Sequence, residues 1–257
     1  MTGALLAAAG ITMQFGRVAA VRNVSLAIGP GESIGIVGES GSGKSTVARI
    51  LAGLQPPSSG QVLFRDQPVY TGGTAYPGAL RRQVQMVFQD PYGSLNPRMT
   101  ALAAVAEACR FHDKCTAAEA GEKSLHLLSR MGISPADARK KPRELSGGQR
   151  QRASVARALS ATPSVLIADE PTSAIDQSAQ AQLLNLFHGL LGQGLSIVLI
   201  SHDLAVIRYL ARRVHVMRDG EVVESGDTRM VFDDPQHAYT RALIASIPGR
   251  RPKDPAL

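Results

Sequence analysis

The chain has 257 residues, of which 44% are hydrophobic and 19% charged, and it carries a formal net charge of +7. This length allows a substantial core and at most two compact units, but no apolar run approaches the roughly 20 residues of a membrane-spanning helix. The opening MTGALLAAAG lacks the basic region of a signal peptide, and two cysteines make no disulfide framework, so we expect a cytosolic protein.

Short apolar segments alternate with helical patterns along the chain. We expect strands at 24–28, 33–37, 62–64, 84–88, 164–168 and 196–200, a helix from Lys44 to about Gly53, mostly helical structure over 97–161, and a hairpin at Asp219-Gly220. Runs such as SVLIA and SIVLI are typical of parallel strands that are buried on both faces. The pattern predicts one α/β domain over 1–257, with a core formed by 1–90 and 158–230, a helical subdomain over 91–157 and a C-terminal tail over 231–257.

The segment GESGSGKS follows a predicted strand and opens a predicted helix, which is the context of a phosphate-binding P-loop. Glycines allow backbone N–H groups to wrap phosphates, and the helix N-terminus adds positive potential. Lys44 is expected to reach the β- and γ-phosphates of a nucleotide, and the Ser45 hydroxyl to hold Mg²⁺. The candidate phosphate contacts are Gly38, Glu39, Ser40, Gly41, Ser42, Gly43, Lys44 and Ser45.

Two carboxylates end the buried strand of LIADE, Leu166–Glu170. An acidic residue at the end of a strand beside a P-loop holds Mg²⁺ in this class of site, which is the role expected of Asp169. Glu170 is expected to point the other way along the strand and to polarise the attacking water.

A second glycine-containing helix start lies in LSGGQRQR, Leu145–Arg152. Ser146 can be the N-cap and Gln149 can close a capping box. Gly147 and Gly148 in the first turn cost about 1 kcal/mol each relative to alanine, so this start is expected to serve close contact with an anion. Local chemistry leaves open whether that anion is bound by this chain or by another.

These motifs together resemble the ATPase subunit of an ABC transporter. The match includes GESGSGKST, Gln89 after a strand, LSGGQRQR, LIADEPTSAID and ISHDL, in that order. The resemblance implies a RecA-like P-loop NTPase core with an antiparallel β part and a helical subdomain, acting on ATP with Mg²⁺. It implies a head-to-tail pair of ATPases, in which Ser146, Gly147, Gly148 and Gln149 complete the site of the other subunit.

The resemblance also implies roles for isolated residues. Gln89 would sense Mg²⁺ and the attacking water, although by itself it is an ordinary surface glutamine. His202 would lie near the γ-phosphate, although by itself it is a polar residue at a strand end. Asp176 would act across the dimer, and Phe15 would stack on adenine. Thr46, the last residue of GESGSGKST, joins the residues expected to bind the nucleotide.

A narrower resemblance, to the dipeptide, oligopeptide and nickel importer subfamily, is carried by MVFQDPYGSLNPRMT and FDDPQHAYTRALIASIP. Gly93, Ala238 and Ile175 stand where Ser, Pro and Leu are usual. No cysteine follows Cys115, so we expect no iron–sulfur cluster, and the cargo stays open between peptides and metal chelates. The implied partners are a sister or identical ATPase, two membrane permease subunits and, indirectly, a substrate-binding protein. The implied location is peripheral, at the cytoplasmic face of the membrane.

The sequence leaves two alternative functions open. A nucleic-acid-linked ABC ATPase is disfavoured by the short spacing from Lys44 to Ser146, and the basic clusters 139–143 and 249–253 lack interleaved aromatics, so no nucleic-acid partner is expected. A non-transport complex of the carbon–phosphorus lyase type is the other alternative.

Cys109, His112 and Cys115 would spread over about 120° of a helix without a fourth ligand, so we expect no metal site there.

Overall fold

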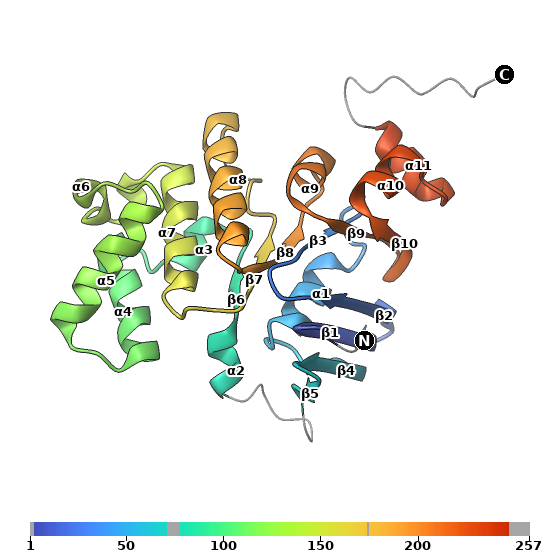
Figure 1. Ribbon diagram of the computed structural model, residues 1–257, viewed down its shortest axis with the longest axis horizontal. Helices are drawn as coiled ribbons and strands as arrows, with labels where there is room; N and C mark the ends of the chain where they lie inside the picture. The colour runs from blue at the N-terminus through green and yellow to red at the C-terminus, as the bar shows by residue number, and fades with distance from the viewer. Residues whose placement is uncertain (1–2, 71–77, 174, 247–257) are drawn as a thin grey trace.

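The computed structural model describes residues 3–70, 78–173 and 175–246 (Figure 1). Its strands are β1 (Leu6–Phe15), β2 (Val18–Ile28), β3 (Ser33–Val37), β4 (Ser59–Phe64), β5 (Gln67–Pro68), β6 (Val84–Val87), β7 (Val165–Asp169), β8 (Ser196–Ile200), β9 (Arg213–Arg218) and β10 (Glu221–Asp227). Its helices are α1 (Lys44–Leu51), α2 (Gly78–Gln83), α3 (Pro91–Ser94), α4 (Ala101–Asp113), α5 (Ala117–Arg130), α6 (Pro135–Ala138), the 3₁₀ helix η1 (Pro142–Glu144), α7 (Gly147–Leu159), α8 (Gln177–Gly192), α9 (Leu204–Leu210), α10 (Thr228–Asp233) and α11 (Ala238–Ala245). Within the described ranges, no helix has both the length and the apolar character that crossing a bilayer requires.

The larger sheet is six-stranded, in the order β10-β9-β3-β8-β7-β6, and all neighbours except β10 and β9 are parallel. Every residue of β3, β7 and β8 is buried, as the continuous apolar runs predicted. The predicted hairpin at Asp219-Gly220 joins β9 to β10 and is confirmed. Parallel strands place their carboxyl ends on one edge, so the segments that follow β3, β7 and β8 meet there.

The smaller sheet is antiparallel, in the order β2-β1-β4-β5. Helix α1 packs against β1 and β2 of this sheet and against β7 and β8 of the larger one, and Ile11, Ile36 and Ile50 contribute to the core between them. Strand β1 was not among the strands predicted from the sequence. β1 pairs with β2 in a hairpin that turns at Gly16 and Arg17, and its other edge pairs with β4, which is distant in the chain.

A helical region follows β6. Its apolar residues belong to a second hydrophobic core, separate from the one around α1, in which Val105, Leu128 and Val155 are fully buried. Its helices α4, α5, α6 and α7 begin at side-chain N-caps Thr100, Thr116, Ser134 and Ser146, each of which accepts a hydrogen bond from a first-turn backbone N–H. The expected helical subdomain ended at residue 157, whereas α7 continues to Leu159.

The segment 231–257 was expected to be a C-terminal tail, and its described part is helical. Residue 231 lies inside α10, which packs against β10, β9 and α9, and α11 follows. Tyr239, Thr240 and Ile244 of α11 are buried. The basic cluster 249–253 lies outside the described residues.

Cys109, His112 and Cys115 do not lie on one helix, contrary to the arrangement considered from the sequence. Helix α4 ends at Asp113, and Lys114 has a left-handed backbone with φ of 52°, so Cys115 lies off the helix. Cys109 is buried with its Sγ 3.5 Å from the hydroxyl of Ser124, and the His112 ring lies edge-on to Phe111. The three side chains therefore lie in different surroundings.

Candidate nucleotide-binding site

The loop that joins β3 to α1 has the shape expected of a phosphate cradle. Helix α1 begins at Lys44, and its N-cap is Gly43, which offers no side chain to cap the first turn. Backbone N–H groups at such a helix start are open to an anion. The loop thus provides the electrostatic element that the sequence predicted.

Two glycines allow this loop to lie directly against neighbouring strands. Gly38 has φ of 151°, and a Cβ at this position would lie 2.1 Å from the carbonyl oxygen of Met217 in β9. Gly43 has φ of 99°, and its Cβ would lie 2.3 Å from the carbonyl oxygen of Ala20 in β2. A side chain at either position would strain the backbone, because φ is positive, and would push the loop away from the strand beside it.

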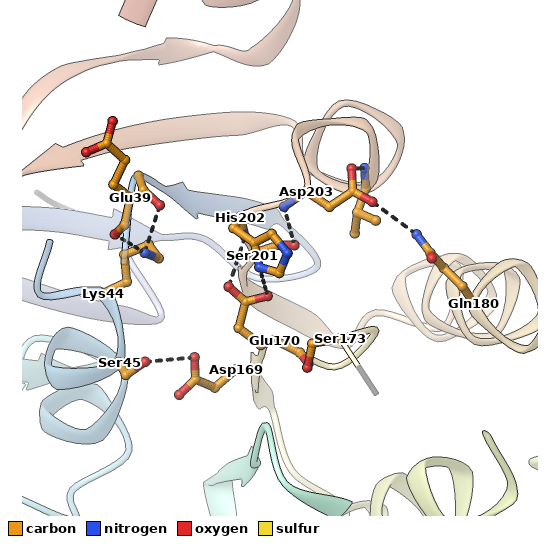
Figure 2. A network of polar contacts seen from close by, with 12 residues as sticks. Glu39, Lys44, Ser45, Asp169, Glu170, Ser173, Gln180, Ser201, His202 and Asp203 are labelled. Atoms are coloured by element: carbon orange, nitrogen blue, oxygen red, sulfur yellow. Dashed lines mark hydrogen bonds and ion pairs between the residues drawn. The ribbon is translucent and has the colours of Figure 1, made fainter. Parts of the chain in front are cut away.

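Lys44 is buried at the centre of the loop. Its Nζ donates hydrogen bonds to the carbonyl oxygens of Gly38 at 2.8 Å and Glu39 at 2.7 Å (Figure 2). Burial lowers the pKa of this ammonium group, and the nearby charges of Glu170 and Asp169 oppose that shift. The loop therefore contains a cation that is enclosed by oxygen atoms and faces two carboxylates.

Asp169 ends β7 and is 4% exposed. Its Oδ1 accepts a hydrogen bond of 3.2 Å from the Ser45 hydroxyl (Figure 2). Burial raises the pKa of this carboxyl, and the charge of Glu170 adds to the rise. A hydroxyl and a carboxylate at one point are the oxygen donors that Mg²⁺ takes beside nucleotide phosphates, so the residues present fit this ion.

Glu170 differs from the expectation in its backbone. It does not continue the alternation of β7: it follows the strand with φ of 48°, a left-handed conformation, and its N–H donates to the carbonyl oxygen of Ile200. Its carboxylate is held by the turn after β8, because Oε1 accepts the backbone N–H of His202 at 2.9 Å and Oε2 lies 2.8 Å from His202 Nδ1. Figure 2 shows Glu170 and His202 facing each other above Asp169.

A second group of predicted residues lies at the starts of α7 and α8. The capping box at Ser146 and Gln149 is present, with hydrogen bonds of 3.2 and 2.9 Å. Asp176 is the N-cap of α8 and accepts the N–H of Ala179. The two helix starts touch, since a Cβ on Gly148 would lie 2.6 Å from the Cβ of Ala179.

This contact corrects the interpretation of the two glycines. Gly148 is buried, so close packing of α7 on α8 explains at least its own lack of a side chain. Gly147 is exposed. The glycine pair therefore does not by itself indicate that both residues contact an anion.

Gln89 and Phe15 lie on the margins of the loop site. Gln89 is exposed and follows β6, which pairs in parallel with β7, so it lies at the same sheet edge as Asp169. Phe15 is 49% exposed at the end of β1, in the hairpin whose second strand reaches the loop through Ala20.

The sequence profile of the family described as "ABC transporter" matches residues 21–173. The chain belongs to the ABC transporter family. A second profile, described as the oligopeptide/dipeptide transporter C-terminal region, matches residues 223–257. The α/β fold with its P-loop and helical region agrees with this family.

Known members of the family are similar over most of the chain. The oligopeptide transport ATP-binding protein AppF of Bacillus subtilis is 44% identical over 92% of this chain and 72% of its own length. The glutathione import ATP-binding protein GsiA of Pectobacterium atrosepticum is 45% identical over 90% of this chain, which spans 37% of GsiA. A dimeric ATP-binding cassette in a post-hydrolysis state bound to ADP and Pi matches with a TM-score of 0.75 and 31% identity, over 87% of this chain and 99% of the cassette.

Some residues of this ABC site were not predicted from the sequence. Asp203 caps α9 and accepts a hydrogen bond of 3.3 Å from Gln180 of α8, which links the turn at His202 to the helix that begins at Asp176 (Figure 2). An aspartate directly before an apolar helix is a recognisable N-cap signal. Tyr239 contacts the loop from α11; it lies in the quoted segment FDDPQHAYTRALIASIP, but nothing in that segment indicates a contact with the loop.

Proposed function

We propose that this chain is the ATP-hydrolysing subunit of an importer that takes up peptides through separate membrane subunits. The observation that carries the catalytic part is the meeting of Lys44, the Ser45–Asp169 pair and the Glu170–His202 pair at one edge of the parallel sheet. The profile match and the relatives named above support the importer part.

The chain's own residues divide the work on bound ATP. Lys44 and the N–H groups at the start of α1 offset the charge of the phosphates, which stabilises charge that develops on the transferred phosphoryl group. Ser45, Asp169 and Gln89 would hold Mg²⁺, which neutralises part of that charge. Glu170 would accept the proton of the attacking water, and His202 fixes the carboxylate in place through two contacts.

The second group, Ser146 to Gln149 with Asp176, is proposed to act on ATP held by another ATPase subunit. Ser146 and Asp176 are exposed at the starts of α7 and α8, where a facing subunit can reach them. The similar solved cassette is a dimer bound to ADP and Pi, which supports this arrangement. Phe15 is proposed to stack on adenine at the rim of the loop site.

The proposed cargo is a peptide. AppF is named for oligopeptide transport and GsiA for glutathione import, and the C-terminal profile is described for oligopeptides and dipeptides. The proposed partners are a sister or identical ATPase, two permease subunits, and a substrate-binding protein that acts through them. This assignment places the chain at the cytoplasmic face of the membrane.

Two measurements test the proposal. The first is titration of the purified chain with a fluorescent ATP analogue and Mg²⁺, beside Lys44→Ala; we expect saturable binding that this substitution removes. The second is affinity purification of the tagged chain from its own cells, in which we expect permease subunits. If the wild-type chain binds no nucleotide, the ATPase role is wrong; if lyase subunits co-purify in place of permeases, the transport role is wrong.

A further inference from the structure

The C-terminal helix α11 is fixed to the core at its first residues. Glu224, in β10, accepts the backbone N–H of Gln236 at 2.8 Å and of His237 at 3.0 Å. Burial raises the pKa of Glu224, but the side chain of Thr240 together with these two N–H groups outweighs that effect, so the pKa is lowered. A carboxylate at a helix start satisfies N–H groups that the helix cannot pair itself, so α11 has a defined place on β10.

From that place, α11 puts one side chain on the P-loop. The hydroxyl oxygen of Tyr239 accepts the backbone N–H of Glu39 at 3.0 Å. The Tyr239 residue is 7% exposed, and the guanidinium of Arg218 lies 5.1 Å from the centre of its ring. The ring is thus held on two sides, and its hydroxyl has a fixed position relative to the loop.

Glu39 connects this contact to the cation of the site. Its N–H is bound to Tyr239, and its carbonyl oxygen accepts hydrogen bonds from Lys44 Nζ at 2.7 Å and from the N–H of Ser42 at 3.2 Å. The N–H of Glu39 is therefore turned away from the interior of the loop, towards α11. A shift of this residue moves the oxygen that holds Lys44.

We propose that Tyr239 is a positioning residue for the P-loop: its hydroxyl fixes the backbone of Glu39, and thereby the loop conformation and the place of Lys44. The inference rests on the proposed ATPase function. It assigns the C-terminal helix a part in nucleotide binding, although α11 supplies no group that touches the phosphates.

The substitution that isolates the hydroxyl is Tyr239→Phe, since it keeps the ring and its contact with Arg218. It leaves the Glu39 N–H without its acceptor in a partly buried place, and unmade hydrogen bonds of this kind weaken the organised state. We expect the affinity for Mg-ATP to fall by about three- to tenfold. Tyr209→Phe is the matched control, because the Tyr209 hydroxyl bonds Asn185 between α9 and α8 on an exposed surface.

Three readouts are measured on the full chain: the dissociation constant of Mg-ATP, amide hydrogen exchange at Glu39, and the thermal unfolding midpoint. The proposal expects weaker ATP binding and faster exchange at Glu39 in Tyr239→Phe, with Tyr209→Phe equal to wild type in both. A lower midpoint with unchanged ATP affinity and unchanged exchange at Glu39 would show that Tyr239 only packs, which overturns the proposal.

The same titration separates this inference from the function on which it rests. If the wild-type chain binds Mg-ATP and Tyr239→Phe binds it equally well, the positioning role is wrong and the ATPase assignment stands. If wild type and Lys44→Ala both fail to bind, the ATPase assignment itself is wrong, and the positioning role with it.

Discussion

The contact between Gly148 and Ala179 allows a test that separates packing from chemistry at the start of α7. Alanine at 148 would place two methyl carbons 2.6 Å apart, so α7 and α8 must separate by about an ångström to reach van der Waals contact. Overpacking of this kind costs about 1–3 kcal/mol, and the higher helix propensity of alanine returns about 1 kcal/mol. We expect Gly148→Ala to lower the free energy of unfolding by up to about 2 kcal/mol, and the melting temperature by up to about 8 °C.

The compensating change is Ala179→Gly, which removes the opposing methyl group. A double-mutant cycle by urea unfolding should give a favourable coupling of about 1–3 kcal/mol between the two sites. Gly121→Ala is the matched control: it is also a helical glycine, but a Cβ there meets nothing within 4 Å, so it should stabilise the chain slightly. Additive effects of the two substitutions would refute the steric reasoning.

The same double variant tests the role of Gly148 in hydrolysis. If Gly148 also approaches a nucleotide held by a facing subunit, the assembled complex should stay slow even after stability is restored. Recovery of hydrolysis together with stability would show that packing is the whole role of this glycine.

Four further predictions concern other parts of the chain. Glu170→Gln should keep ATP binding but reduce phosphate release by the complex about 10²- to 10⁴-fold, since the amide cannot accept a proton; near-normal turnover would remove Glu170 from the mechanism. Ser146→Arg should leave the nucleotide affinity of the isolated chain almost intact while stopping hydrolysis by the complex, and a large loss of affinity in the isolated chain would show that the motif acts in cis. Burial and the charge of Arg213 lower the pKa of His215 to about 4, so the unfolded chain binds more protons below pH 6.5, and the free energy of unfolding should fall by about 3 kcal/mol as the pH drops from 6.5 to 4. Urea titrations across this range should show a flatter dependence for His215→Leu than for wild type or the exposed His188→Leu, and equal slopes would contradict the assignment. Finally, calorimetry of the isolated chain should detect no binding of di- to pentapeptides or Ni²⁺, whereas a stoichiometric Ni²⁺ isotherm that is lost when Cys109 and Cys115 become serine would make the helical region a metal sensor.

Much of the site could be predicted because its chemistry is local in the chain. The P-loop needs glycines, a lysine and a hydroxyl within one strand-turn-helix segment, and the structure has this segment where GESGSGKS predicts it. The Ser146–Gln149 capping box spans three residue steps, so its hydrogen bonds could be predicted from spacing. The buried strands β3 and β8 have the predicted bounds, because central strands of a parallel sheet carry continuous apolar runs.

The details that the sequence did not predict depend on neighbours that are distant in the chain. Strand alternation predicted the direction of Glu170, but its left-handed backbone and its contacts with the turn at His202 determine where the carboxylate lies. The segment from 231 was expected to be a tail, because the anchors of α11 are Glu224 and the P-loop rather than a local signal.

By itself, the sequence determined the α/β class, the family and the residues that we propose to contact phosphate, since each depends on residue type and short spacing. Only the tertiary structure decided which groups hold those residues in place: Met217 and Ala20 behind the loop glycines, Ala179 against Gly148, and Tyr239 on Glu39. The physical reason is that packing and hydrogen bonding act over a few ångströms of space, whatever the separation along the chain, and no local pattern encodes a contact between residues 39 and 239.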